Sequence, residues 1–344
     1  GKTILFALRN EGISQKNLAM RMGISEKHLS QIINGEASFS VEFAFKLANT
    51  LGGSVSFWNN LERNYQETKA KIARQQQIRS EIPLLAEYPY NELARREYVS
   101  KTSDKEAQVE NLHRFFSVYS LHYVPKIENT AFRMKGEEQG KGGTIAAWLR
   151  CGEIEARKQQ VAAYRETKLK QILPKLKELT RLPVGESLSG ITSLLNSAGV
   201  AIVFIRHFQG TRVSGAFRWV HDVPFIQLSD YYPWADIMWF NLFHEIGHLV
   251  LHKKKESFLD FDSGNTQLDP LKEAEADDFA CEQLIPSGEY SRFLQKGDFS
   301  SEGIRTFAAT LNIDTGIVAG RLCHDKKVHW KKVSQLRPRL PKTM

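Results

Sequence analysis

The segment Phe240–His252 contains the pattern His-Glu-x-x-His, which brings two imidazoles and a carboxylate into one short stretch. On a helix, residues four apart lie one turn apart on the same face, so His244 and His248 can bind a single metal ion. Glu245 lies beside them and can reach a metal-bound water without binding the ion itself. The remaining positions of the segment are strongly apolar, as in a buried helix. The pattern therefore predicts metal-assisted hydrolysis.

A catalytic zinc site also needs a third protein ligand and an open position for water. The segment Lys272–Pro286 is rich in carboxylates and offers candidates for that ligand. Its apolar residues Ala276, Phe279, Ala280 and Leu284 have helical spacing, which predicts a second helix. Two histidines and a carboxylate suit Zn²⁺ best, with Mn²⁺ or Fe²⁺ as alternatives.

The succession of HEIGHLVLH and EADDFACEQLIP resembles the ImmA/IrrE family of metallopeptidases, over roughly residues 145–325. The resemblance implies Glu275 as the third ligand beside His244 and His248, and Glu245 as the general base. It also implies a zincin-like domain with a narrow substrate, commonly a cognate repressor that is cut to release transcription. Three neighbouring residues are expected to face solvent or to support the ligands without binding the ion, namely His252, Glu273 and Asp277.

A second motif lies near the N-terminus, between Ser14 and Gly35. Ser14 can cap a first helix, and Gly23 supplies the positive φ angle that ends it in a tight turn. Ser25 can cap a second helix, whose apolar positions Leu29, Ile32 and Ile33 face a core. The outer face then carries Glu26, Lys27, His28, Ser30 and Gln31, which are suited to base edges and phosphates in a major groove.

This stretch resembles the XRE/Cro-type helix-turn-helix, and the segments Val41–Ala48 and Ser56–Leu61 make it most similar to the HigA-type antitoxin branch. The resemblance covers about residues 1–70. It implies that Ser25–Ile33 is the recognition helix and that Gln15 lies near a phosphate. We therefore expect binding to an operator in double-stranded DNA, through a homodimer that reads two half-sites. The residues expected to contact DNA are Gln15, Ser25, Lys27, His28, Ser30 and Gln31.

Composition restricts the class of protein. Of the 344 residues, 42% are hydrophobic and 25% are charged, which is typical of a globular protein, and the formal net charge of +8 is compatible with a polyanionic partner. The three cysteines are far apart and odd in number, which argues against a disulfide framework. We find no apolar run that could span a bilayer and no signal-peptide pattern, so we expect a cytoplasmic protein without membrane contact.

The elements that must position these motifs are mostly helical. Three short strands are predicted at Val200–Phe204, Val213–Val220 and Pro224–Leu228. The expected fold class is therefore mostly α with a small antiparallel β-sheet (α+β). We expect a five-helix domain over residues 1–78, a helical connector over 79–175, and over 176–344 a zincin-like domain with a helical C-terminal extension.

Three functions remain open from the sequence. The first is a transcriptional regulator with an active metal-dependent endopeptidase that cleaves a cognate regulatory protein. The second is a HigA-like antitoxin or autoregulator of a toxin–antitoxin pair, in which the peptidase-like domain senses or binds a toxin or another partner without turnover. The third is a peptidase whose helical module recruits a protein rather than DNA.

Overall fold

The computed structural model describes residues 1–124, 142–220, 222–252, 258–261 and 270–341, with backbone only for 258–261. The chain divides into two compact units, Gly1–Glu81 and Ile82–Met344. The division falls close to the boundary that we predict at residue 78. The boundary that we predict at residue 175 lies inside the second unit and stays a prediction. Among the described helices, none combines the length and the apolar character that a membrane crossing needs.

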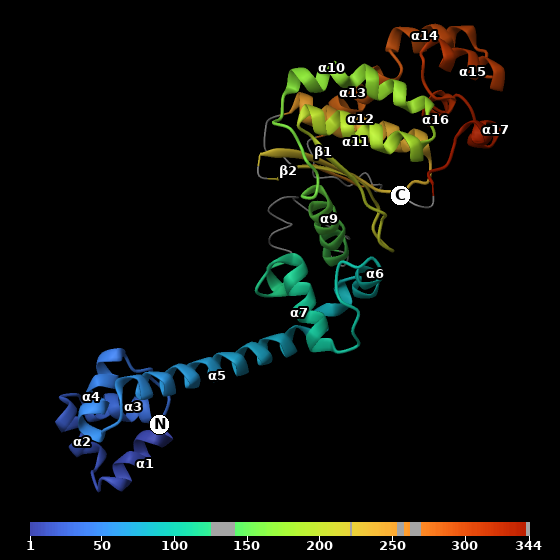
Figure 1. The fold of residues 1–344 in the computed structure, drawn as a ribbon. Helices are drawn as coiled ribbons and strands as arrows, with labels where there is room; N and C mark the ends of the chain where they lie inside the picture. Colours follow the sequence, from blue (N-terminus) through green and yellow to red (C-terminus); the bar gives the residue numbers. More distant parts are fainter. Residues whose placement is uncertain (125–141, 221, 253–257, 262–269, 342–344) are drawn as a thin grey trace. The chain divides into compact units, whose positions relative to one another are not determined.

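The first unit consists of five helices, as predicted (Figure 1). Leu18, Ala19, Leu29 and Leu47 are buried at its centre, together with Trp58 from the last helix. Their burial holds four short helices around one core, since short helices depend mainly on the packing of an apolar face. The bounds are α1 Lys2–Asn10, α2 Gln15–Met22, α3 Glu26–Ile33, α4 Val41–Leu51 and α5 Val55–Glu81.

Side-chain caps set the ends of α2 and α3. The Ser14 hydroxyl accepts a hydrogen bond from the backbone N–H of Asn17 (3.2 Å), and Ser25 accepts one from the N–H of His28 (3.1 Å). Gly23 has a φ of 62° at the C-terminus of α2, a conformation that glycine adopts without strain. The predicted helix–turn–helix geometry is therefore present, with its caps at the predicted residues.

The second unit begins with short helices and continues into longer ones that pack against a sheet (Figure 1). The bounds before the sheet are η1 Ile82–Glu87, α6 Tyr90–Arg95, α7 Lys105–Phe116, η2 Leu121–Tyr123, α9 Gly142–Ala156, α10 Glu166–Glu178, η4 Leu179–Arg181 and α11 Val184–Ala198. The helices after the sheet begins are α12 Ala235–Leu251, α13 Pro270–Leu284, α14 Ser287–Lys296, α15 Ser301–Thr310, α16 Thr315–His324 and α17 Trp330–Val333, followed by η5 Ser334–Leu336.

The sheet has the strand order β1-β3-β2-β4, from β1 Ala201–Phe204, β2 Val213–Val220, β3 Val223–Leu228 and β4 Phe258–Phe261. β2 pairs antiparallel with both β3 and β4, whereas β1 pairs parallel with β3. The α+β class and the three predicted strands are confirmed. The sheet is mixed rather than wholly antiparallel, because β1 and β3 run in the same direction.

The two faces of the sheet meet different helices. Phe217, Ile226 and Leu228 join the main core, which also contains residues of α10, α11, α12 and α16. On alternate positions, where side chains point to the opposite face, the Gln227 amide donates to the carbonyl of Trp148 in α9 (2.7 Å). Figure 1 shows α9 on the side of the sheet opposite to α11 and α12. Helix α12 is thus enclosed between the sheet and other helices.

Candidate metal centre and DNA-recognition helix

Helix α12 places the two motif histidines one turn apart and inside the protein. The side chains of His244 and His248 are buried, and their Nε2 atoms lie 2.9 Å from each other. Their ring planes are nearly perpendicular, with the ring centroids 4.6 Å apart. Both imidazoles therefore direct the same nitrogen toward a shared point, as the spacing of the motif predicts.

Helix α13 supplies the carboxylate. It packs closely against α12 at Gly247, where an added Cβ would lie 3.1 Å from the Cα of Ala276. This close approach brings the carboxylate of Glu273 to the histidines, with Oε2 3.4 Å from His244 Nε2 and Oε1 3.3 Å from His248 Nε2. One ligand atom from each of the three residues lies within 4.8 Å of the others.

The structure places Glu273, not Glu275, in this group. The side chain of Glu275 is 62% exposed against 20% for Glu273, and its Oε2 lies 3.7 Å from His252 Nδ1. The reason is helix geometry, since two residues along a helix turn a side chain by about 200° around the axis. The expectation that Glu273 faces solvent or only supports the ligands is corrected by the same geometry.

The apolar spacing within α13 held the signal that separates the two glutamates. Ala276 and Ala280 are buried on the side of α13 that faces the core. Residues three or four apart share a helix face, so Glu273 lies on the side of Ala276, and Glu275 is turned away from it. Helical phase therefore selects Glu273, where the family resemblance implied Glu275.

Asp277 supports the first histidine. Its Oδ1 lies 2.8 Å from His244 Nδ1, and it stands one turn after Glu273 on the same face of α13. A carboxylate at Nδ1 favours the tautomer that carries its proton there, which leaves the Nε2 lone pair directed at the cluster. Metal-binding histidines in proteins commonly have such a partner. This contact agrees with the expectation of a supporting role for Asp277.

Charge in the group is compatible with a bound cation. Burial lowers the pKa of His248 to about 4, against the opposing effect of the nearby Glu273 carboxylate, so its imidazole is neutral at pH 7. Burial works to raise the pKa of Glu273, but the two adjacent imidazoles of His244 and His248 outweigh it and bring the pKa to about 2. A neutral imidazole and an ionised carboxylate are the forms that bind a metal ion.

Glu245 is buried next to the sheet. An added Cβ at Gly215 of β2 would overlap the Oε1 atom of Glu245, so a side chain at this position would displace the carboxylate from where it lies. Sequence reasoning missed Gly215, which nevertheless stands within the predicted second strand. A glycine inside a strand often marks such a close approach. β2 thereby fixes where the Glu245 carboxylate lies.

His252 continues the same face of α12 but does not join the three-residue group. Its Nε2 lies 3.1 Å from the carbonyl of Lys272, and its ring centroid is 5.1 Å from that of His248. These contacts place it between the last turn of α12 and the first turn of α13. It therefore packs beside the metal-binding group, as expected for a residue that supports the ligands without binding the ion.

The donor set fits a divalent metal ion. Two imidazole nitrogens and a carboxylate, all converging and largely removed from solvent, are the protein ligands of many catalytic zinc sites. The contact between Asp277 and His244 adds the orientation that such ligands need. His244, His248 and Glu273 would hold the ion, and these ligands do not by themselves specify which divalent metal it is.

Helix α3, on which we expect the DNA contacts, has the opposite character. Its inner face buries Leu29 and Ile32, while Lys27 and His28 are exposed and Gln31 is half-buried. His28 also packs edge-on against Phe43 of α4, at 6.0 Å between ring centroids. Of the other residues expected at the DNA, Ser25 is exposed, and Gln15 and Ser30 are half-buried. All six remain accessible in part, as contact with a duplex requires.

Comparisons with protein families match both parts of the chain. Residues 5–58 match the family described as Helix-turn-helix, which is of the XRE type. Residues 197–322 match the family described as IrrE N-terminal-like domain, a peptidase family. The second match includes β1 to β3, α12 and α13, and therefore every residue of the candidate metal centre. No curated protein matches the chain.

Proposed function

We propose that this chain, which joins a helix-turn-helix DNA-binding domain to an IrrE-like metallopeptidase domain, is a transcriptional regulator that cleaves a cognate regulatory protein. The observation that carries the proposal is the convergence of His244, His248 and Glu273 beside a buried Glu245. A metal ion in such a site supplies a polarised carbonyl and an acidified water for peptide hydrolysis. Zn²⁺ is the metal that these ligands suit best.

The chain's own residues would then perform the remaining tasks. His244 and His248 hold the ion through Nε2, and Asp277 keeps the proton of His244 on Nδ1. Glu245 takes a proton from the attacking water and passes it to the leaving amine, as a general base and then a general acid. Gly215 keeps β2 close without displacing that carboxylate.

In the DNA-binding part, the proposed contacts lie on and before α3. Lys27, His28 and Gln31 would reach base edges or phosphates from the recognition helix, with Ser25 and Ser30 beside them. Gln15, at the start of α2, would contact a phosphate. The proposed partner is an operator in double-stranded DNA that a homodimer reads as two half-sites.

Glu245→Gln tests the proteolytic part. It retains the size of the side chain and removes the base, so metal binding and DNA binding should persist while a target protein remains uncut. The measurement compares the proteomes of cells that carry wild type, Glu245→Gln or the control Glu302→Gln at an exposed carboxylate, in search of a protein cut only when Glu245 is present. If Glu245→Gln cells show the same cut proteins as wild-type cells, the proposal is overturned. That result would favour an autoregulator or antitoxin that acts without turnover.

The DNA-binding part is tested by selecting, from a pool of random DNA duplexes, those that the purified protein binds, and by measuring the affinity of each variant for the selected duplex. Lys27→Ala and Gln31→Ala should each weaken binding to the selected duplex, Gln31→Ala by about 1–3 kcal/mol if it contacts a base edge. Lys71→Ala, in the exposed part of α5, is the control and should change binding little. Equal binding by all variants would indicate that the helical domain recruits a protein instead.

A further inference from the structure

Helix α6 and the segment after β1 enclose a cleft of about 700 Å³. A volume of this size is typical of sites for small organic ligands. The α6 side of the cleft precedes residue 197, so it lies outside both family matches. None of its lining residues belongs to the candidate metal centre. The residues of interest here are Glu92, Arg95, Arg96, Tyr98, Arg206 and His207.

Positive charge dominates the lining of this cleft. Among the lining residues, Arg95, Arg96 and Arg206 face the carboxylate of Glu92, which pairs with Arg96 and lies 3.5 Å from Arg95. Arg206 also pairs with Asp230 at 3.0 Å, so three guanidinium groups face two carboxylates and one positive charge is in excess. The side chains of Arg95 and Arg206 are 77% and 55% exposed, so both guanidinium groups can reach a ligand from solvent. The excess of cations indicates that the ligand carries negative charge.

Arg96 holds the backbone segment after β1 in place. It donates hydrogen bonds to the carbonyls of Arg206 (2.7 Å) and His207 (2.9 Å), and its guanidinium lies 4.1 Å from the centre of the Phe208 ring. These contacts tie the segment after β1 to α6. Because the backbone is held, the exposed arginines lose less freedom when they bind a ligand than they would on a free loop.

The topology of the sheet also puts the cleft where ligands commonly bind. Arg206 and His207 follow β1, and Asp230 follows β3, its parallel neighbour. Asp230 accepts hydrogen bonds from Arg206 Nε (3.0 Å) and from the backbone N–H of His207 (2.8 Å). In sheets with parallel strands, ligands commonly bind beyond the carboxyl ends of those strands. The cleft lies at that edge.

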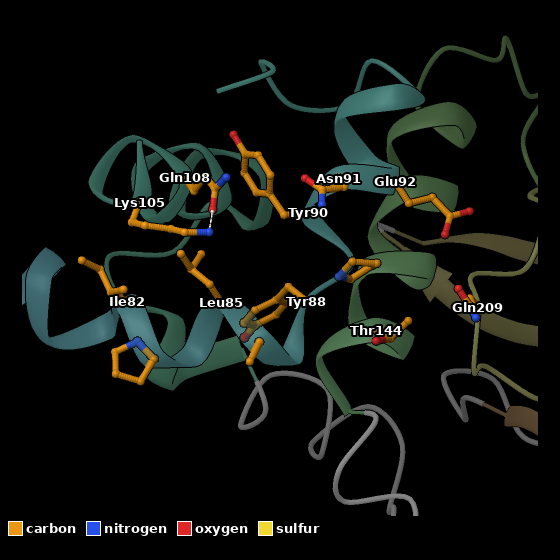
Figure 2. Close-up of a pocket in the computed structure, with 13 residues that line it drawn as sticks. Ile82, Leu85, Tyr88, Tyr90, Asn91, Glu92, Lys105, Gln108, Thr144 and Gln209 are labelled. Atoms are coloured by element: carbon orange, nitrogen blue, oxygen red, sulfur yellow. Dashed lines mark hydrogen bonds between the residues drawn. The ribbon is translucent and has the colours of Figure 1, made fainter. Parts of the chain in front are cut away.

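The adjoining cleft, drawn in Figure 2, differs in chemistry. It has a volume of about 620 Å³ and shares Glu92 and Gln209 with the first. Its lining cation is Lys105, which donates to Gln108 at 3.2 Å, as the dashed line in Figure 2 shows. Tyrosine, proline and amide residues account for most of its other lining residues. It therefore lacks the excess of arginines that defines the first cleft.

We propose that the first cleft binds the phosphate group of a small metabolite, so that the regulator has an effector site separate from its metal centre. Arg95 and Arg206 would contact the phosphate, since guanidinium groups bind its oxygens in pairs. Two arginines favour a doubly charged phosphate over a carboxylate. The half-buried rings of Tyr98 and Phe204 offer the organic part of the ligand an apolar wall.

Calorimetric titration of the full chain tests this site with inorganic phosphate and with adenosine monophosphate, at constant ionic strength. Adenosine is the uncharged probe. Both phosphates should bind and adenosine should not. Arg95→Gln should weaken phosphate binding at least tenfold, and its high exposure leaves the fold intact. Arg206→Gln should act in the same direction.

Lys105→Gln is the matched control, because it removes a cation from the adjoining cleft, and it should change phosphate binding less than twofold. Glu245→Gln should also bind phosphate like wild type, which separates this site from the proposed proteolysis. The proposal is overturned if neither phosphate binds, if adenosine binds as well as its monophosphate, or if Arg95→Gln and Lys105→Gln have equal effects.

Discussion

Helices α12 and α3 both carry functional residues, but they present them in opposite ways. On α12 the residues His244, Glu245 and His248 are buried, and another helix of the same chain completes the site. On α3 the candidate contacts Lys27 and His28 point outward, and the proposed completion is a duplex. A buried site therefore depends on the phase and packing of a second element, whereas an exposed one depends on its own helix and its partner.

Loss of a histidine should have the largest effect. His248→Ala leaves only one imidazole and one carboxylate in the group, those of His244 and Glu273. Loss of a residue that merely supports a ligand lowers metal affinity about ten- to hundredfold, so loss of a ligand itself should lower zinc affinity by more than that. Competition with a chromophoric chelator measures this affinity. His324→Ala, at a largely exposed histidine, should bind zinc like wild type. Zinc binding by His248→Ala at wild-type strength would place the ion elsewhere.

Loss of the supporting carboxylate should have a smaller effect on the same property. Asp277→Asn weakens the contact that holds His244 Nδ1, so we expect zinc affinity to fall about ten- to hundredfold. The neighbouring Asp278 is exposed, and Asp278→Asn is the control that also removes one negative charge. Equal losses in the two variants would mean that long-range charge, rather than orientation of the histidine, is responsible.

A substitution that crowds the buried Glu245 carboxylate tests how far the α12 site depends on packing. In Gly215→Ala the new methyl group would overlap the Glu245 carboxylate, and such overpacking typically lowers the free energy of unfolding by about 1–3 kcal/mol. Urea denaturation measures it. Gly288→Ala places a methyl group where nothing lies within 4 Å, so that variant should not be destabilised. Wild-type stability of Gly215→Ala would show that β2 does not restrict Glu245.

The smallest effect is expected on α3, the proposed recognition helix. Ser25→Ala removes the hydroxyl that caps α3, which should lower the free energy of unfolding of the first unit by about 1 kcal/mol. Thermal unfolding followed by circular dichroism measures the loss, and zinc affinity should not change. Ser38→Ala, at an exposed serine between α3 and α4, is the control. A drop in zinc affinity would contradict the independence of the two sites.

Much of the fold was predictable because local signals agree with it. The caps Ser14 and Ser25, the turn glycine Gly23 and the apolar spacing of α3 define α2 and α3 without long-range information. The positions of β1, β2 and β3 also follow from local sequence, whereas β4 was not predicted. The directions of the strands do not follow from it, because the parallel pairing of β1 with β3 depends on how the chain crosses the sheet.

The candidate site was predictable only within one helix. The spacing of His244 and His248 fixes their relation, since both lie on α12. Glu273 and Gly215 come from other elements, and their approach depends on the contact of Gly247 with Ala276 and on the register of β2. The family resemblance implied Glu275 as the third ligand. The packing of α13 on α12 instead brings Glu273, two residues earlier, against the histidines.

The most direct test of the account compares two glutamates on one helix. Zinc is titrated into metal-free Glu273→Gln and Glu275→Gln, which remove the same charge from positions two residues apart. We predict that Glu273→Gln loses most of its zinc affinity and that Glu275→Gln binds zinc like wild type, because Glu273 reaches both histidines. Retained affinity in Glu273→Gln together with lost affinity in Glu275→Gln would contradict the proposed centre.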